Sequence, residues 1–387
     1  MTSAIVMGDV DVVRALGVAG IRCALFALPD ERARYSRHVA EVLPWVDHWQ
    51  RPQDVASALM KFAARQDVAP VVFPQTDGDL LVISRQRERL AGSLRHCLAD
   101  ATLIEDLVDK ERFAALADRA ALPVPATGRL DPSSGRGPAD LDLCFPLVVK
   151  PIVRRDRWSP LSSAKARHVA TPDELADVWE LLVIDDLRVL VQEAIPGPES
   201  LVESYHAYVD ASGEVVAEFT GRKIRTLPSR YGTSTAVEIT DAPELARLGR
   251  ELYARIGLRG VAKADFKRDR DGCLKLLEIN PRFTLWHHPA TLAGVNIPAL
   301  VHADLSGRPR PRVRPASPGV TWCDPLADLR AARAAGQSTA AWLRWSRGCE
   351  ARSGFAWDDP APLLRAGVWP VVRGRLGRLA ARTSRRA

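Results

Sequence analysis

Two apolar stretches, residues 260–267 and 274–279, lie on either side of a short run rich in arginine, aspartate and glycine. Such a run is typical of a β-hairpin turn, so the sequence predicts two antiparallel strands. Successive side chains of a strand alternate between its two faces. Glu278, Asn280 and Arg282 therefore point to one face, whereas the intervening apolar residues point into the core.

The polar face of this hairpin has the composition of a cation site. If Asp265 on the first strand faces Glu278 and Asn280, two carboxylates and an amide oxygen converge. Mg²⁺ prefers such ligands and completes its shell with nucleotide phosphates, and Mn²⁺ is an alternative ion. Arg282 is then available for a phosphate or a developing oxyanion. A surface salt-bridge cluster is the competing interpretation, which the apolar neighbours of Glu278 disfavour.

Positive charge is unevenly distributed along the chain. The net charge is +7, with 46 arginines and eight lysines, yet residues 308–387 alone carry 16 arginines and five acids. The preceding residues therefore balance at −4. A nucleic-acid-binding domain spreads basic residues over its folded body, so we expect no nucleic-acid partner. For the tail, a solvated helix is a simpler interpretation than contact with an anionic surface.

Targeting signals and cysteine motifs are missing from the sequence. The first residues lack the basic and apolar regions of a signal peptide, and no apolar stretch has the length of a membrane span. The six cysteines show no CxxC spacing, which argues against a zinc site, a redox pair or a disulfide scaffold. We therefore expect a cytoplasmic protein with reduced thiols and no membrane span.

The pattern of the chain divides it into segments. Within residues 1–105, short apolar runs alternate with helical stretches, which predicts a small α/β domain with a parallel sheet. Its first turn, residues 7–9, lacks a full dinucleotide-binding fingerprint. Hairpin patterns follow in a mixed α+β region, residues 106–307. Residues 308–387 begin with an arginine- and proline-rich linker and are mostly helical in pattern.

Further motifs occur in a fixed order before the hairpin. They are Asp109-Lys110-Glu111-Arg112-Phe113, Phe145-Pro146-Leu147-Val148-Val149-Lys150-Pro151, Val191-Gln192-Glu193-Ala194-Ile195-Pro196-Gly197-Pro198-Glu199 and Arg222-Lys223-Ile224-Arg225. With Asp265 and residues 278–282, this ordered set resembles the ATP-grasp enzymes of the carboxylate–amine ligase type. The resemblance covers roughly residues 100–305.

This resemblance implies an α/β and α+β fold. A parallel-sheet pre-ATP-grasp domain (1–105) precedes two ATP-grasp lobes with antiparallel sheets, lobe A (106–187) and lobe B (188–307), and a helical C-terminal extension (308–387). Lobe B would carry the magnesium and phosphate site. The implied activity joins a carboxylate to an amine through an acyl phosphate, with ATP and Mg²⁺ as cofactors, in specialised small-molecule or peptide metabolism.

The resemblance also assigns roles to individual residues. ATP phosphates would meet Lys110 and Lys150, and the costly burial of a lysine that ends an apolar strand independently supports an anion beside Lys150. The backbone that meets adenine would be Gln192, Glu193, Ala194 and Ile195, with Glu199 on the ribose hydroxyls. The metal ligands would be Asp265, Glu278 and Asn280. The γ-phosphate or the substrate carboxylate would meet Arg222, Lys223, Arg225 and Arg282.

Two segments depart from the family pattern. The family has a glycine-rich phosphate loop after the second lysine strand, but residues 153–163 contain no glycine. Guanidinium and hydroxyl groups would then replace the backbone amide contacts to phosphate, or the loop would close differently. Residues 283–288 bring aromatic rings together with His287 and His288. These rings would line the acceptor pocket with a histidine as base, or would simply pack in the core.

Three questions stay open at this stage. The aromatic residues 283–288 would also suit a relative that attaches an amino acid to an enolic cyclohexenone, as in mycosporine-type metabolism. The missing glycines of residues 153–163 are compatible with a nucleotide-binding protein without turnover. The tryptophans of residues 322–369 would bury a homodimer contact or pack on their own core.

Overall fold

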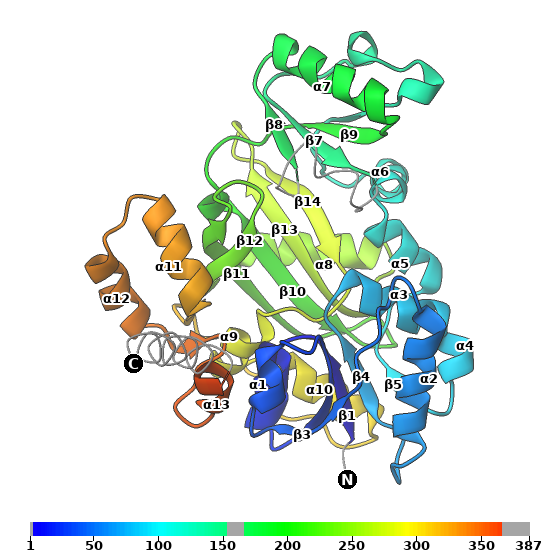
Figure 1. Ribbon diagram of the computed structural model, residues 1–387, viewed down its shortest axis with the longest axis vertical. Helices are drawn as coiled ribbons and strands as arrows, with labels where there is room; N and C mark the ends of the chain where they lie inside the picture. Colours follow the sequence, from blue (N-terminus) through cyan, green and yellow to red (C-terminus); the bar gives the residue numbers. More distant parts are fainter. Residues whose placement is uncertain (1–2, 153–165, 366–387) are drawn as a thin grey trace, which may run out of the picture. The chain divides into compact units, whose positions relative to one another are not determined.

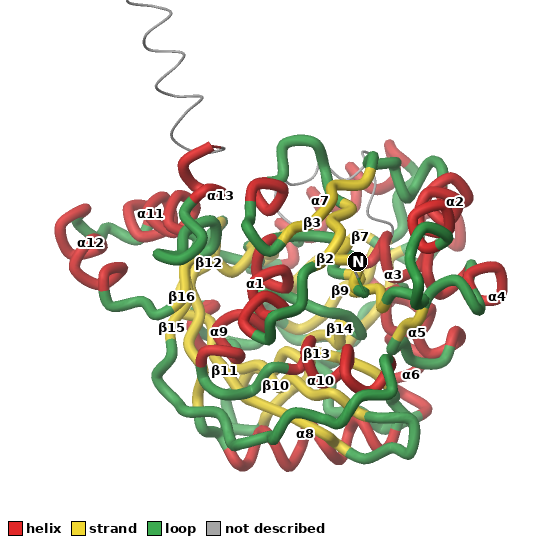
Figure 2. The backbone as a smooth tube through the Cα atoms, turned by 90° about the horizontal axis from the view of Figure 1, so that it is seen from below, coloured by secondary structure: helices red, strands yellow, loops and turns green. Residues whose placement is uncertain are grey.

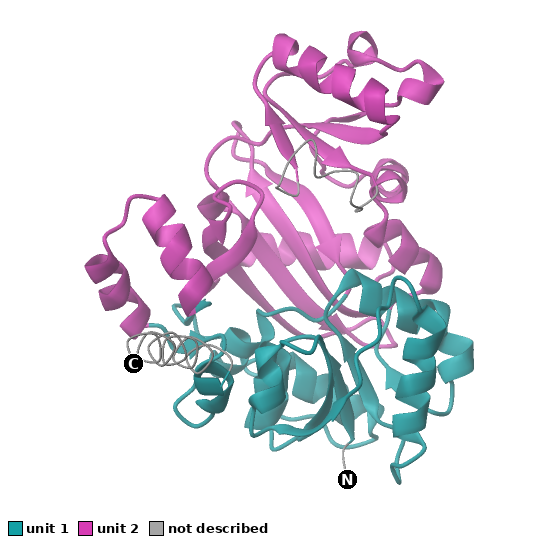
Figure 3. Ribbon diagram, viewed as in Figure 1, with its two compact units in different colours: residues 1–98, 282–324, 349–387 teal, residues 99–281, 325–348 magenta. Residues whose placement is uncertain are grey.

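The computed structural model describes residues 3–152 and 166–365, which form two compact units (Figure 3). Unit 1 is drawn from residues 1–98, 282–324 and 349–387, and unit 2 from residues 99–281 and 325–348. Each unit therefore combines separated parts of the chain, whereas the four predicted segments are continuous. The glycine-free segment 153–163 and the terminal arginines beyond residue 365 lie outside the described residues.

Unit 1 is built on a parallel five-stranded sheet in the order β3-β2-β1-β4-β5, as the alternating pattern predicts (Figure 1). The strands are β1 (Ala4–Met7), β2 (Cys23–Phe26), β3 (Val39–Leu43), β4 (Val71–Pro74) and β5 (Arg95–His96). The connecting helices are α1 (Val10–Val18), α2 (Pro52–Ala63), α3 (Asp77–Arg85) and α4 (Arg87–Leu90). Strands β1, β2 and β4 are buried along their whole length, which is typical of parallel strands covered on both faces.

The rest of unit 1 comes from later parts of the chain. Helices α9 (His287–Leu292) and α10 (Ile297–Leu305) pack on α1, and β15 (Thr321–Cys323) pairs in parallel with β16 (Ala351–Arg352). The short helix α13 (Ala361–Leu363) contacts the 3₁₀ turn η1 (Arg32–Tyr35). Arg14 of α1 holds Asp359 at 3.4 Å in a buried ion pair. Part of the predicted C-terminal extension is thus integral to unit 1.

Unit 2 contains a small antiparallel sheet in the order β6-β9-β7-β8. Its strands are β6 (Thr127–Leu130), β7 (Leu147–Pro151), β8 (Arg167–Val169) and β9 (Val189–Glu193). Helix α7 (Pro172–Asp185) shares one apolar core with this sheet. The helix begins as its sequence predicts, because Thr171 accepts a hydrogen bond from the Glu174 N–H and proline occupies the first turn.

The larger sheet of unit 2 contains antiparallel strands in the order β14-β13-β10-β11-β12. These strands are β10 (Glu203–Val209), β11 (Val215–Leu227), β12 (Thr233–Thr240), β13 (Gly260–Arg268) and β14 (Leu274–Asn280). Helix α8 (Pro243–Arg255) packs against β10 and β11 (Figure 2). Strand β11 continues to Leu227, so the basic motif of residues 222–225 lies within a strand.

Four further helices complete unit 2. Residues 101–119 form two helices, α5 (Ala101–Val108) and α6 (Lys110–Arg119), because Asp109 has an extended backbone and caps α6. Helices α11 (Pro325–Ala334) and α12 (Thr339–Arg347) come from the predicted C-terminal extension, and α11 packs against β11 and β12. Within the described ranges, no helix is long and apolar enough to cross a membrane.

Candidate active site

Neighbouring strands of the larger sheet bring the predicted metal ligands together. Asp265 on β13 lies opposite Glu278 on β14 and opposite Ser204 on β10. Asn280 donates its side-chain N–H to Glu278 Oε1 at 3.0 Å, and Ser204 donates its hydroxyl to Asp265 Oδ1. The two carboxylates and the amide that strand alternation predicts on one face are therefore adjacent.

Two lysine ammonium groups lie beside these carboxylates. Lys263 Nζ is 2.7 Å from Asp265 Oδ2 and 4.0 Å from Glu278 Oε1. Lys223 Nζ, from β11, is 3.7 Å from Asp265 Oδ2 and 3.9 Å from Glu199 Oε2. Burial opposes ionisation of Asp265, but Lys263 and Lys223 outweigh it and hold the pKa of Asp265 well below its usual range. Burial also opposes the charge of Lys223, yet Asp265 and the two glutamates raise its pKa.

This set of oxygen atoms fits a hard divalent cation. Asp265 and Glu278 supply carboxylates and Asn280 supplies an amide oxygen, which are ligands that Mg²⁺ accepts. In the described part of the chain, no cluster of three or more His, Cys, Asp or Glu side chains is arranged to hold a metal ion. A cation on these residues therefore needs further oxygen ligands, which the phosphates of a nucleotide can supply.

The small sheet supplies a second pair of lysines. Lys150 on β7 donates its ammonium to Gln192 Oε1 on β9 at 2.7 Å, and Gln192 donates its amide to Thr127 Oγ1 at 2.9 Å. Lys110, the first residue of α6, donates to the carbonyl of Pro151, which follows Lys150. Burial lowers the pKa of Lys150, although the charges of Glu278 and Glu199 act in the opposite direction. The structure therefore brings the two predicted phosphate-binding lysines to one strand end.

The predicted hinge follows β9 directly. The backbone N–H groups of Glu193 and Ala194 donate to the carbonyls of Ala126 and Pro146, both at 2.9 Å. The N–H of Ile195 donates to no acceptor among the residues that the structure describes. Ile195 is therefore the hinge donor that stays available to a ligand.

The hinge is held by a lysine that the sequence analysis did not single out. Lys267 on β13 is buried, and its ammonium donates to the carbonyls of Ile195 and Gly197 at 3.3 and 2.6 Å. Lys263, Asp265 and Lys267 occupy alternate positions of one strand. Strand alternation was therefore a signal that could have identified both lysines.

Two predicted basic residues are not brought to this site. Arg222 immediately precedes the site lysine of β11, so its side chain points to the opposite face, where its guanidinium lies 2.6 Å from Glu238. Arg225 follows a register shift in β11 and forms a bidentate pair with Asp328 of α11, at 2.8 and 2.6 Å. Its guanidinium carbon also lies 4.0 Å from the ring centroid of Trp345.

Arg282 belongs to unit 1 rather than unit 2. Its Nε lies 2.6 Å from Asp77 Oδ1 at the start of α3, and its Nη1 donates to the Gln75 carbonyl at 2.8 Å. Both partners follow β4, at the carboxyl end of the parallel sheet. This edge, between β1 and β4, is where the strand order of the sheet reverses.

The paired histidines begin α9 and are both buried in unit 1. Burial lowers the pKa of His287 to about 3, so this imidazole holds a proton weakly. His288 Nδ1 lies 3.3 Å from Asp11 Oδ1, and the indole N–H of Trp322 donates to the same oxygen at 2.8 Å. These environments favour the packing interpretation of the histidines over a role as general base.

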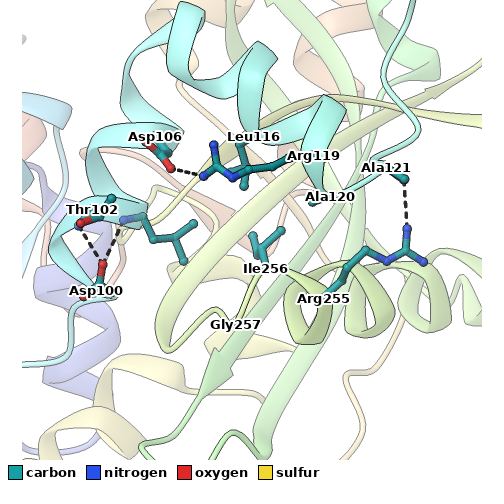
Figure 4. A pocket seen from close by; sticks show the side chains of 11 residues that line it. Asp100, Thr102, Asp106, Leu116, Arg119, Ala120, Ala121, Arg255, Ile256 and Gly257 are labelled. Carbon is teal, nitrogen blue, oxygen red and sulfur yellow. Dashed lines mark hydrogen bonds and ion pairs between the residues drawn. The ribbon is translucent and has the colours of Figure 1, made fainter.

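A separate cavity of about 740 Å³ lies in unit 2, where α5, α6 and the end of α8 meet (Figure 4). Asp106 binds Arg119 beside it, and Arg255 donates to the carbonyl of Ala121 at 3.0 Å. None of the predicted site residues lines this cavity.

Comparisons with known proteins show which families the chain resembles. Residues 188–323 match the family described as ATP-grasp in the biosynthetic pathway with Ter operon. A D-alanine–D-alanine ligase of Pseudomonas fluorescens is 26% identical, with 54% of this chain and 64% of the relative covered. A D-aspartate ligase of Enterococcus faecium is also 26% identical, with 59% and 56% covered. The chain thus spans less than two thirds of the length of these curated relatives.

Solved structures resemble the chain in fold. The ADP complex of an N5-carboxyaminoimidazole ribonucleotide synthetase has a TM-score of 0.62 at 14% identity, covering 82% of this chain and 80% of the other. An L-amino acid ligase from Bacillus licheniformis has a TM-score of 0.59 at 15% identity, covering 79% and 74%. These matches show that residues 188–323 are similar to an ATP-grasp family and that the chain shares the fold of these solved structures.

Proposed function

We propose that this chain is an ATP-dependent ligase that joins a carboxylate to an amine. The substrate carboxylate attacks the γ-phosphorus of ATP and the bond to the β–γ bridging oxygen breaks, which gives an acyl phosphate and ADP. The amine then attacks the acyl carbon, phosphate leaves with the bonding pair, and the amine loses a proton. The products are one amide, ADP and phosphate.

The observation that carries this proposal is the arrangement of charge within unit 2. One sheet presents the oxygen set of Asp265, Glu278 and Asn280, and the other presents Lys110 and Lys150 at one strand end. A triphosphate needs both kinds of group, since its metal requires oxygen ligands and its remaining charge requires cations.

Each group has a role in this proposal. Asp265, Glu278 and Asn280 would hold Mg²⁺, with Mn²⁺ as an alternative, and the bound ion would neutralise charge on the phosphates. Lys110 and Lys150 would bind phosphate oxygens. On the nucleoside, the Ile195 N–H would meet adenine and Glu199 would meet the ribose hydroxyls. Lys223 would meet the γ-phosphate.

On the acceptor side of the reaction, Arg282 would meet the substrate carboxylate or a developing oxyanion in this proposal. Its guanidinium is positioned by Asp77 and by the Gln75 carbonyl. The names of the relatives refer to D-alanine, D-aspartate and L-amino acids. We therefore propose small amino-acid-like compounds for both the acid and the amine.

Compartment and assembly complete the proposal. None of the six cysteines, all within the described residues, forms a disulfide, which supports a reducing compartment such as the cytoplasm. A homodimer through the C-terminal tryptophans has weaker support, because Trp322 and Trp342 are buried within their own units and Trp345 stacks on Arg225. Sedimentation of the purified protein measures this directly, and a monomer at working concentration would remove the dimer from the proposal.

Turnover with paired substrates tests the ligase. With Mg·ATP, phosphate and ADP should form only when an acid and an amine from a panel of D- and L-amino acids are both present. Glu278→Gln should abolish this turnover. Glu238→Gln, on the same sheet but paired with Arg222 on the other face, is the matched control and should retain it. Tight ATP binding without turnover across amino acids and enones would instead support a nucleotide-binding protein that is not an enzyme.

A further inference from the structure

The charges on the site face of the larger sheet are close to balance. Asp265, Glu278 and Glu199 contribute three negative charges, and the ammonium groups of Lys263 and Lys223 lie within 4.0 Å of them. Lys267, two residues beyond Asp265 on β13, is a further lysine of this sheet and is buried. Three carboxylates are therefore accompanied by three lysines.

Lys263 is the cation most closely bound to the predicted metal ligands. Its ammonium is nearer to Asp265 Oδ2 than that of Lys223, at 2.7 Å against 3.7 Å, and only it reaches toward Glu278 Oε1. The other oxygen of Asp265 accepts the Ser204 hydroxyl. Any metal ion that binds Oδ2 must therefore compete with the Lys263 ammonium for the same oxygen.

This competition has different outcomes for a bare ion and for an ion carried by a nucleotide. A bare divalent ion would displace an ammonium group from its carboxylate and leave two uncompensated positive charges in a partly buried site. The complex of a divalent ion and a triphosphate has a net negative charge. The displaced ammonium can then bind a phosphate oxygen, so both cations keep an anionic partner.

We infer that Lys263 makes the carboxylate pair select the metal–nucleotide complex over the free metal ion. Lys263 acts as a counter-ion to Asp265 before the nucleotide binds and as a phosphate ligand afterwards. This inference rests on the proposed function, because it takes Asp265 and Glu278 as ligands of the metal carried by ATP. It adds a specificity-determining residue that lies two positions before the first metal ligand.

A binding assay with Mn²⁺ tests the inference without turnover. The electron paramagnetic resonance signal of the free ion measures how much Mn²⁺ remains unbound. Wild-type protein should bind Mn²⁺ weakly alone and tightly with a non-hydrolysable ATP analogue. Lys263→Met should tighten binding of Mn²⁺ alone by about tenfold or more, because an ammonium no longer competes for Oδ2. The same variant should weaken binding of the Mn²⁺–analogue complex, because a phosphate contact is lost.

Two further variants control this experiment. Lys275→Met changes a lysine of the same hairpin whose ammonium lies 3.6 Å from Asp269, away from the metal ligands, and should leave both affinities unchanged. Lys263→Arg keeps the charge and should keep weak binding of Mn²⁺ alone. Circular dichroism checks folding, and Lys263→Gln, which keeps a polar side chain, replaces the methionine variant if that variant unfolds.

The outcomes separate the inference from the function on which it rests. Tight binding of Mn²⁺ alone to wild-type protein, unchanged by Lys263→Met, overturns the role of Lys263 while the nucleotide site stands. Failure of the wild-type protein to bind the Mn²⁺–analogue complex overturns the proposed function itself. Opposite shifts of the two affinities in Lys263→Met support the inference.

Discussion

Unit 2 contains two pairs of lysines, one on the larger sheet and one formed by Lys150 of the small sheet and Lys110 of α6, and their partners differ. On the larger sheet, Lys263 and Lys223 lie beside carboxylates. On the small sheet, Lys150 donates to the Gln192 amide oxygen and Lys110 to the Pro151 carbonyl. One pair therefore lies beside carboxylates, whereas Lys150 and Lys110 donate to neutral oxygen atoms.

This difference explains the opposite pKa shifts of two lysines. Lys223 and Lys150 are both partly buried, and burial alone lowers the pKa of either. The carboxylate charges around Lys223 reverse the effect and raise its pKa, whereas burial prevails at Lys150. Lys150 therefore has the greater unmet need for an anion, which is the property expected of a phosphate-binding residue.

The largest effect should follow from removal of the central carboxylate. Asp265→Asn deprives Lys263 and Lys223 of their shared counter-ion, so we expect a loss of about 3–5 kcal/mol in the free energy of unfolding. Turnover should fall by about 10²–10³-fold in protein that remains folded. Urea unfolding and steady-state kinetics measure these effects. Glu244→Gln, an exposed partner of Arg268, is the control and should leave both unchanged. A stable, active Asp265→Asn variant would contradict the comparison.

Removal of Lys150 should weaken ATP binding without a loss of stability. Lys150→Met should weaken ATP binding by about tenfold to a hundredfold, since a charged contact to phosphate is lost. Stability should stay unchanged or increase, because the variant buries no ammonium group. Isothermal titration with an ATP analogue and urea unfolding measure the two quantities. If Lys150→Met destabilised the protein as much as Asp265→Asn, the distinction between the two lysine pairs would fail.

At alkaline pH, Lys150 and Lys223 should change the free energy of unfolding in opposite directions. The pKa of Lys150 in the folded protein is below its ordinary value of 10.5, so the unfolded chain binds this proton more tightly. The free energy of unfolding therefore rises as the pH increases toward 10.5. The pKa of Lys223 lies above 10.5, so its contribution is present below that pH and is lost above it. Between about pH 8 and pH 10, the stability of wild-type protein should therefore rise relative to Lys150→Met. Urea unfolding at several pH values measures the difference, and a parallel pH dependence in both proteins would argue against it.

Acidic pH provides the corresponding contrast for the carboxylates. The pKa of Asp265 is depressed in the folded state, so its contribution to stability is present above its ordinary pKa and is lost as pH falls below it. Asp265→Asn should lack this acid-dependent part of the stability.

Sequence reasoning succeeded where a local rule governs the structure. Alternation along a strand predicts that Asp265, Glu278 and Asn280 share a face, and the register of β13 with β14 makes them neighbours. The capping residues of α7 predict its start in the same way. Lys263 and Lys267 follow the same alternation, although neither is among the predicted site residues.

Sequence reasoning could not predict contacts between residues that lie far apart in the chain. Asp328 binds Arg225 across 103 residues, and no local pattern around Arg225 indicates that partner. The boundary between the two units falls within the Asn280-Pro281-Arg282 motif, so the motif does not show that its last residue belongs to another unit. Residues 325–348 join unit 2 for the same kind of reason, since the packing of α11 on β11 is a tertiary contact.

The smallest effect should come from Arg222, and it tests alternation itself. Arg222 and Lys223 are adjacent in a basic motif, but Arg222 pairs with Glu238 on the face opposite Asp265, and its side chain is 49% exposed. An exposed ion pair of this kind contributes less than about 1 kcal/mol to stability. Arg222→Gln should therefore change turnover by less than about twofold, whereas Lys223→Gln should reduce turnover strongly. Kinetics of the two variants side by side measure this, and equal losses would show that both residues reach the substrates. The two residues are neighbours in the motif. A difference in turnover between their variants therefore reflects the face of the strand to which each side chain points.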